Sequence, residues 1–247
     1  MTAAAQGGPG AGPAAPAPVG GLVLDLDGTL ADTPGAIASI MTKILADQGA
    51  PADEATVRAL VGRPLEQNFA HLLGRAQDAP EVAAAVRSYR ELFRAHLEGT
   101  DPADLACPGV TEGLRRARAQ GLLMGVATSK PRGAAERLLR LMGVADLFRV
   151  VAGDDSVRRS KPDPEMAFLV AGGLGLPPDR CVVVGDGTAD MEMGRSAGMR
   201  TIGVSYGVAT PDELLAAGAD EVVDSFDAVL VHLAGTAPRR PTDDKEL

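Results

Sequence analysis

Aromatic residues and cysteines are both scarce in this sequence. Phenylalanine, tyrosine and tryptophan together make up 3% of the 247 residues, and tryptophan is absent. A buried core must therefore be built mainly from leucine, valine and alanine. The only cysteines, Cys107 and Cys181, lack the spacing of a metal-binding cluster. Nothing beyond their number supports a disulfide, so a reducing compartment, the cytoplasm, is the simpler expectation.

Positive charge and long apolar runs are lacking as well. The formal net charge is −9 and the isoelectric point is about 4.9. No basic stripe interrupts this acidic balance, so nucleic acid is not an expected partner. No apolar run approaches the ~20 residues that a membrane-spanning helix requires, so no membrane association is expected. The sequence predicts a soluble protein.

Both ends of the chain have the composition of unfolded tails. Residues 1–19 are mostly alanine, glycine and proline, with no basic residue ahead of an apolar stretch. We therefore predict a disordered tail there rather than a secretory signal. Residues 236–247 are rich in proline and charge, and we predict a second flexible tail. The whole chain, 45% hydrophobic and 23% charged, has the composition of a globular protein with one core and room for a smaller second domain.

The segment Leu22–Leu30 runs from apolar residues into two acids. Its apolar start is typical of a buried strand that ends at a polar site. Because residues two apart in a strand point the same way, we expect the side chains of Asp25 and Asp27 to converge. Gly28 permits a sharp turn, and Thr29 offers a hydroxyl and an amide to the same place. Two converging acids need a cation or a shared proton, although taken alone this pattern also suits an acidic turn that closes a strand.

Only helical patterns occur between Leu30 and the later strands. Apolar residues at helical spacing predict four helices in this block, over residues 37–45, 53–61, 65–73 and 81–97. The absence of a strand pattern predicts an all-helical cap domain, residues 34–105, inserted into a core domain formed by residues 20–33 and 106–235.

Strands and helices alternate after Cys107, which predicts a parallel sheet with helices on both faces. The expected strands are Leu122–Ala127, Phe148–Ala152, Cys181–Val184, Thr201–Val204 and Glu221–Val223. The expected helices are Val110–Gln120, Pro131–Met142, Pro164–Gly173, Asp190–Ala197 and Pro211–Ala217. In such sheets ligands bind beyond the carboxyl ends of the strands, so the residues just after each strand are the candidates for a site.

Two of these strand ends carry hydroxyl or ammonium groups. Thr128 and Ser129 follow one strand and precede a helix start, where free amides suit a phosphate group. A plain helix cap is the structural alternative for them. Lys161 follows another strand, in a chain with four lysines and twenty arginines. A lysine kept in such a sequence suggests a need for a compact ammonium group, and a solvated loop lysine is the alternative.

The segment 181–190 repeats the opening theme, because an apolar strand again runs into glycine and acids. Asp186 has no evident structural role and is a candidate site residue. Asp190 is a second candidate, and capping of the helix that follows it is the stronger structural explanation.

Taken together, the motifs resemble those of the haloacid dehalogenase superfamily, in the phosphoglycolate phosphatase-like branch with a helical cap. The sequence D-L-D-G-T, the strand ending in Thr128, Lys161 and G-D-x-x-x-D match its four motifs. The resemblance covers residues 21–233. It implies a Rossmann-like α/β core with the inserted all-helical cap domain, and a phosphatase that uses Mg²⁺.

The resemblance also implies roles for individual residues. Asp25 would be the nucleophile that forms an aspartyl-phosphate, and Asp27 would be the general acid and then the base. The metal would be held by Asp25, the backbone carbonyl of Asp27 and Asp186, with Asp190 orienting that sphere. The phosphoryl oxygens would be bound by Thr128, the Ser129 amide and Lys161.

Other readings stay open at this stage. Asp27 argues against a dehalogenase, and the only cap lysine, Lys43, lies mid-helix, which disfavours Schiff-base phosphonate cleavage. A sugar phosphomutase of the β-phosphoglucomutase type and a pyrophosphatase remain alternatives within the superfamily. A regulatory binding protein is the non-enzyme alternative, although such a protein has no reason to keep adjacent like charges. We expect a small phosphorylated metabolite such as phosphoglycolate, and the sequence does not identify it or the oligomeric state.

The tripeptide Gly62-Arg63-Pro64 interrupts two helices of the expected cap. Glycine and proline on either side of Arg63 predict a tight turn with the guanidinium projecting outward. In relatives with this cap, the corresponding loop reaches over the site. Arg63 is therefore a candidate anion clamp for a substrate carboxylate or a second phosphate. An exposed arginine, either solvated or paired with Glu66, is the alternative.

Overall fold

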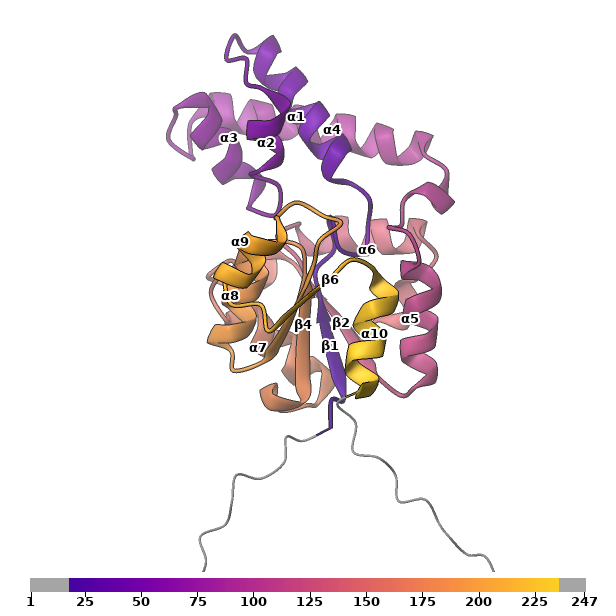
Figure 1. The fold of residues 1–247 in the computed structure, drawn as a ribbon. Coiled ribbons are helices and arrows are strands. Elements are labelled where there is room, and N and C mark those ends of the chain that lie inside the picture. The colour runs from indigo at the N-terminus through magenta and orange to yellow at the C-terminus, as the bar shows by residue number, and fades with distance from the viewer. Residues whose placement is uncertain (1–17, 236–247) are drawn as a thin grey trace, which may run out of the picture.

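The computed structural model describes residues 18–235 and contains one parallel sheet of six strands (Figure 1). The strands are β1 (Gly21–Leu24), β2 (Leu123–Ala127), β3 (Val150–Ala152), β4 (Cys181–Gly185), β5 (Arg200–Val204) and β6 (Glu221–Val223). Their order across the sheet is β3-β2-β1-β4-β5-β6. The central β1 therefore pairs with β2 on one side and β4 on the other. The chain changes direction across the sheet at this point, where ligands bind in doubly wound folds.

Helices cover both faces of the sheet. One face packs against α5 (Val110–Ala119), α6 (Arg132–Leu141) and α10 (Phe226–Gly235), and the other against α7 (Glu165–Leu174) and α8 (Thr188–Ser196). The short α9 (Pro211–Ala216) lies beside α8. Leu22 and Leu24 of β1 belong to the first core cluster and Val23 to the second, as the alternation of side chains along a strand requires. The predicted α/β class is confirmed.

A helical insert, residues 34–99, separates β1 from α5. It contains α1 (Pro34–Asp47), α2 (Glu54–Arg58), α3 (Leu65–Leu73) and α4 (Pro80–Gly99). In Figure 1 these helices lie beyond the carboxyl ends of the strands. The chain enters and leaves the insert side by side, because the Asp32 amide donates to the Leu105 carbonyl at 3.0 Å and the Cys107 amide to the Leu30 carbonyl at 3.0 Å.

Three of the seven aromatic residues of the chain pack together in the insert. The Tyr89 and Phe93 rings of α4 stack with their centroids 5.4 Å apart, and the Phe69 ring of α3 meets Tyr89 edge-on at 6.4 Å. Such pairs contribute attraction beyond the burial of their area. These rings belong to the same hydrophobic cluster as the sheet face that α5, α6 and α10 cover.

The predicted elements agree with the structure to within a few residues at most ends, with three differences. The helix α10 was not predicted, although Phe226, Val229, Leu230 and Leu233 have helical spacing and are buried. The helix α6 begins at Arg132, after Pro131, and α8 begins at Thr188, before Asp190. Short 3₁₀ turns lie at Pro102–Asp104, Ala145–Leu147, Asp154–Ser156 and Pro178–Arg180.

The predicted tails fall almost entirely outside the described residues. Residues 18 and 19 are the exception, and there the Pro18 carbonyl accepts a hydrogen bond from Arg180 Nε at 3.1 Å. Both cysteines are buried and free. In the part of the chain that the structure describes, no helix has the length and apolar character needed to span a membrane.

Candidate active site

The two acids of the first motif lie in the loop that follows β1 and take different partners. Asp25 still belongs to the ladder, since its amide donates to the Val184 carbonyl at 2.9 Å. Its side chain meets Lys161, whereas that of Asp27 meets Thr33 and Lys130. Both acids are buried and line one cavity. Both carboxylates therefore lie at the same cavity, as predicted, but each of them is paired with different residues.

Asp186 follows β4 and is held by backbone that approaches it closely. A Cβ atom added at Gly28 or at Gly207 would lie 2.2 Å from Asp186 Oδ2. Gly28 also has a φ of 86°, which favours glycine. The Thr29 hydroxyl donates to Asp186 Oδ1 at 2.8 Å, and the Val208 amide donates to Oδ2 at 2.9 Å. Loops after β1 and β5 thus fix the orientation of this carboxylate.

Asp190 lies in the first turn of α8 and connects that helix to the site. Its Oδ2 accepts a hydrogen bond from the amide of Gly187, the N-cap residue of α8, at 3.1 Å. The sequence interpretation of Asp190 as the capping residue itself is wrong, because Gly187 occupies that position. The other oxygen, Oδ1, accepts from Lys161.

Lys161 is the buried cation of the site. Its Nζ donates to Asp25 Oδ1 and to Asp190 Oδ1, both at 2.6 Å. Its side chain is only 3% exposed, which excludes a solvated loop lysine. Burial by itself disfavours the charged ammonium, but the carboxylates of Asp190 and Asp25 outweigh this effect and raise the pKa of Lys161 above its ordinary value.

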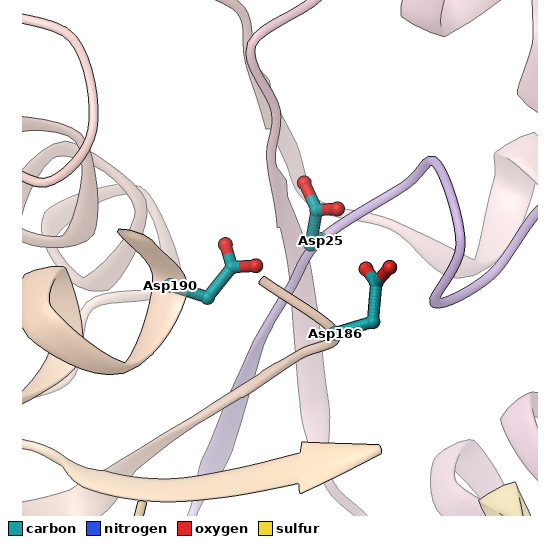
Figure 2. Close-up of side chains that lie close together, drawn as sticks. All are labelled: Asp25, Asp186 and Asp190. Atoms are coloured by element: carbon teal, nitrogen blue, oxygen red, sulfur yellow. The ribbon is translucent and has the colours of Figure 1, made fainter. Parts of the chain in front are cut away.

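Asp25, Asp186 and Asp190 form a buried acidic cluster (Figure 2). One carboxylate oxygen from each lies within 4.8 Å of the others. Burial, more than the neighbouring acids, raises the pKa of Asp186 to about 7. Burial also raises the pKa of Asp25 well above its usual range; the charges of Asp190 and Asp186 add to this shift, and Lys161 opposes it. If all three are ionised, Lys161 balances one charge and leaves two, which a divalent cation would neutralise. The oxygen donors fit a hard ion such as Mg²⁺.

The predicted phosphoryl-binding residues lie at the end of β2. Thr128 is buried, and its Oγ1 accepts a hydrogen bond from the Lys130 amide at 3.2 Å. It does not cap α6, which begins after Pro131 with no side-chain cap. The Ser129 hydroxyl donates to the Gly62 carbonyl at 2.6 Å. Ser129 therefore joins the end of β2 to the insert.

Lys130 is a site residue that the sequence interpretation missed. Its Nζ donates to Asp27 Oδ1 at 2.7 Å and to Oδ2 at 2.8 Å, and it lies 4.5 Å from the centre of the Phe93 ring. The signal was present in the sequence. Lys130 is one of four lysines and follows a strand end, the same features that selected Lys161.

A cavity of about 620 Å³ lies between the sheet and the insert. Asp25, Asp27, Thr128 and Ser129 line it, and so does Arg63 from the insert. Glu66 pairs with Arg90 at 2.8 Å rather than with Arg63, and Arg63 is an exposed residue. Apolar side chains from the insert form another part of the lining, namely Ile37, Met41, Leu65, Tyr89, Phe93 and Leu97. The insert also contributes charged side chains to the lining, among them Arg90 and Arg94.

Comparison with known proteins agrees with this geometry. The family model described as haloacid dehalogenase-like hydrolase matches residues 22–204. A probable phosphatase, IndB, of Dickeya dadantii is 40% identical over 210 residues, which cover 85% of this chain and 91% of that protein. The N-acetylmuramic acid 6-phosphate phosphatase of Pseudomonas aeruginosa is 36% identical, with 82% and 89% covered. A plasmid-encoded phosphoglycolate phosphatase of Cupriavidus necator is 36% identical, with 86% and 92% covered.

These relatives carry the names of phosphatases, and the family match over residues 22–204 includes the three acids of the cluster. The expected class of enzyme, a hydrolase of phosphoric monoesters, is confirmed. The chain belongs to the haloacid dehalogenase-like hydrolase family.

Proposed function

We propose that this protein is a Mg²⁺-dependent phosphomonoesterase that hydrolyses a small phosphorylated metabolite through an aspartyl-phosphate on Asp25. The observation that carries the proposal is the buried cluster of three carboxylates, two of them bound to Lys161, with Asp25 of this cluster lining a substrate-sized cavity. We also place the reaction in the cytoplasm, which suits two cysteines that are free rather than paired.

Asp25 is suited to attack phosphorus. Lys161 holds its Oδ1, and no hydrogen bond reaches its Oδ2 from the residues that the structure describes, so Oδ2 is the oxygen available for the new bond. Lys161, Thr128 and the Ser129 amide would bind the phosphoryl oxygens, where charge must be held during transfer. Asp27 would give a proton to the leaving oxygen and later take one from water.

Asp25, Asp186 and the backbone carbonyl of Asp27 would hold the Mg²⁺ ion, and Asp190 would orient that group through Lys161. The ion would supply positive charge that draws the phosphoryl group and the nucleophile together. The meeting of three carboxylates with a single ammonium group supports this assignment. Removal of divalent ions with a chelator should abolish phosphate release, Mg²⁺ should restore it, and Ca²⁺ should restore it poorly because it is larger and takes more ligands.

We further propose that residues 34–105 act as a cap domain over a core formed by residues 20–33 and 106–235. The position of the insert beyond the strand ends and the close entry and exit of its chain support this division. The insert would shield the phosphoryl group from water and select the rest of the substrate. Arg63 would bind a second anionic group of that substrate.

The substrate is a phosphomonoester such as phosphoglycolate, the substrate named for the relative from Cupriavidus necator. The relative from Pseudomonas aeruginosa is named for a much larger sugar phosphate. A volume of about 620 Å³ and an apolar side leave room for such a leaving group. Both compounds carry a carboxylate as well as the phosphate, which suits Arg63.

A substrate panel tests the proposed function. The purified protein with Mg²⁺ is assayed for free phosphate against phosphoglycolate, sugar phosphates, an aryl phosphate and pyrophosphate. Hydrolysis of monoesters with an acid-trapped phosphoryl group on Asp25 supports the proposal. Preference for pyrophosphate would favour a pyrophosphatase, and conversion of a sugar 1-phosphate to its 6-phosphate would favour a mutase. Binding without turnover of any compound would favour a regulatory protein.

A further inference from the structure

Lys130 has no part in the mechanism proposed above, although its ammonium group contacts the proposed acid and base. Its two hydrogen bonds to Asp27 are 2.7 and 2.8 Å long, and the side chains of the pair are only 13% and 10% exposed. A charged hydrogen bond that is largely shielded from water is stronger than a pair at the surface. We propose that Lys130 is a positioning residue that holds the Asp27 carboxylate for the hydrolysis of the phosphoenzyme.

The contacts of Asp27 leave one oxygen for this task. Oδ1 accepts from Thr33 Oγ1 at 2.5 Å and from Lys130 Nζ, whereas Oδ2 accepts from Lys130 alone among residues 18–235. Two donors on one oxygen and a shared ammonium fix the plane of the carboxylate. The less occupied oxygen, Oδ2, is the one that can accept a proton from water.

Lys130 also connects Asp27 to the insert. It belongs to the loop after β2, it contacts the loop after β1 through Asp27, and its Nζ lies 4.5 Å from the centre of the Phe93 ring of α4. An ammonium group over an aromatic face is attracted to it. Phe93 is in turn stacked on Tyr89. The position of the ammonium, and with it the orientation of Asp27, therefore depends on three segments that are distant in sequence.

The observed pair is the starting form of the second half-reaction. In that step a water proton passes to Asp27 Oδ2, and the water oxygen bonds to phosphorus. The bond from phosphorus to the Asp25 oxygen breaks, and its electron pair returns to the Asp25 carboxylate. Inorganic phosphate leaves, and the proton on Asp27 serves the next leaving oxygen. This assignment rests on the proposed function, because it requires a phosphoenzyme on Asp25.

Replacement of Lys130 by methionine removes the ammonium and keeps an unbranched side chain. With an aryl phosphate, whose leaving group needs no proton, we expect Lys130→Met to lower kcat about 100-fold, the usual contribution of a positioned base. We expect kcat/KM, which reports the steps up to the first transfer, to fall less than about threefold. Acid quenching during turnover should trap more phosphorylated Asp25 than in the wild type, as measured by intact-protein mass.

Two further variants separate positioning from folding. Lys130→Arg keeps the positive charge and should recover kcat to within about tenfold of the wild type, with its different geometry accounting for the remainder. Lys43→Met makes the same change at an exposed site on α1 and should leave kcat unaltered. If Lys130→Met does not fold, as judged by thermal unfolding, Lys130→Gln takes its place.

The proposal is overturned if kcat and kcat/KM fall equally without extra phosphoenzyme, since Lys130 would then act in phosphate binding or in folding. An unchanged kcat overturns it as well. A wild-type protein that releases no phosphate from any monoester refutes the proposed function instead. The two failures are therefore distinguishable in one set of assays.

Discussion

Buried charge is the dominant feature of this molecule at the scale of single residues. Asp25, Asp186 and Asp190 lie together with one cation, Lys161, and a second ion pair, Asp27 with Lys130, lies beside them. Such groups cost stability unless each is paired or neutralised. The pKa values of Asp25 and Asp186 are raised mainly by burial, and the neighbouring carboxylates add to the shift. The arrangement therefore suits the binding of a cation better than it suits a stable empty core.

The Asp25→Asn substitution keeps the shape of the proposed nucleophile but replaces its carboxylate by an amide. An amide cannot form the acyl phosphate, so we expect Asp25→Asn to release no phosphate above background from any monoester. The fold should be retained, because Lys161 keeps its hydrogen bond to Asp190 and a buried negative charge is lost. Phosphate release and thermal unfolding measure the two effects. Substantial activity in a well-folded Asp25→Asn protein would contradict the covalent mechanism.

Arg63, which lines the cavity from the insert, provides a test of substrate recognition. A charged hydrogen bond contributes about 2–3 kcal/mol, so Arg63→Ala should lower kcat/KM about 100-fold for a substrate with a second anion. An aryl phosphate without that anion should be hardly affected. Arg75→Ala, at an exposed arginine of the same insert, is the matched control. Equal losses on both substrates would indicate a defect of folding or of closure of the insert. No loss on either substrate would mean that Arg63 is a solvent-exposed residue with no part in substrate recognition.

At the scale of elements, the site depends on loops that pack against one another at the strand ends. Asp186 comes from the end of β4, but its carboxylate is enclosed by Gly28 after β1 and Gly207 after β5. The Val208 and Ala209 amides donate to its side chain and to its carbonyl at 2.9 and 3.0 Å. The orientation of a single acid is thus set by three neighbouring strands of the sheet.

A methyl group at Gly207 should disturb that orientation. A Cβ there would lie 2.2 Å from Asp186 Oδ2, so the carboxylate must move. We expect Gly207→Ala to weaken Mg²⁺ activation about 10- to 100-fold, the usual effect of misplacing a supporting group. Gly172→Ala on α7, where a Cβ meets no atom within 4 Å, should leave it unchanged. Titration of the activity of each variant with Mg²⁺ measures the effect. If the two variants need the same Mg²⁺ concentration, close packing of Gly207 against Asp186 does not control metal binding.

At the scale of the whole molecule, the acidic cluster ties folding stability to pH and to metal. Without Mg²⁺, Asp186 has a pKa of about 7 in the folded protein and 3.8 as its ordinary value. The folded state therefore binds the proton more tightly, and its contribution to stability is complete below pH 3.8. That contribution is lost as the pH rises toward 7. The raised pKa of Asp25 acts in the same direction.

We therefore expect the metal-free protein to become less stable between pH 5 and 7, by at most about 1.4 kcal/mol per pH unit for each such group. Mg²⁺ should reduce this loss, because it binds the ionised carboxylates of the folded state. Chemical unfolding at several pH values, with chelator or with Mg²⁺, measures the effect. A rise in metal-free stability over this interval that is absent from Asp186→Asn would contradict the assignment.

The sequence by itself determined the elements and the chemistry of the site. Continuous apolar residues in Leu22–Leu24 and Val182–Val184 predicted buried strands, because a strand that is apolar on both of its sides suits a sheet covered on both faces. Acids directly after these strands predicted a shared site, since parallel strands bring their carboxyl ends to one edge. The rarity of lysine selected Lys161 as a candidate compact ammonium group, and α10 could have been predicted from the spacing of its apolar residues.

The tertiary structure decided which charged groups meet. Asp25 and Asp27 are two residues apart, yet Asp25 pairs with Lys161 and Asp27 with Lys130. Those pairs span 136 and 103 residues of sequence, and a pattern in a local window carries no information at such distances. The choice of Gly187 over Asp190 as the start of α8 has the same origin, because Asp190 is drawn toward Lys161. The local sequence pattern therefore shows which residue types lie at the site, and the packing of the loops at the strand ends determines which of these residues contact one another.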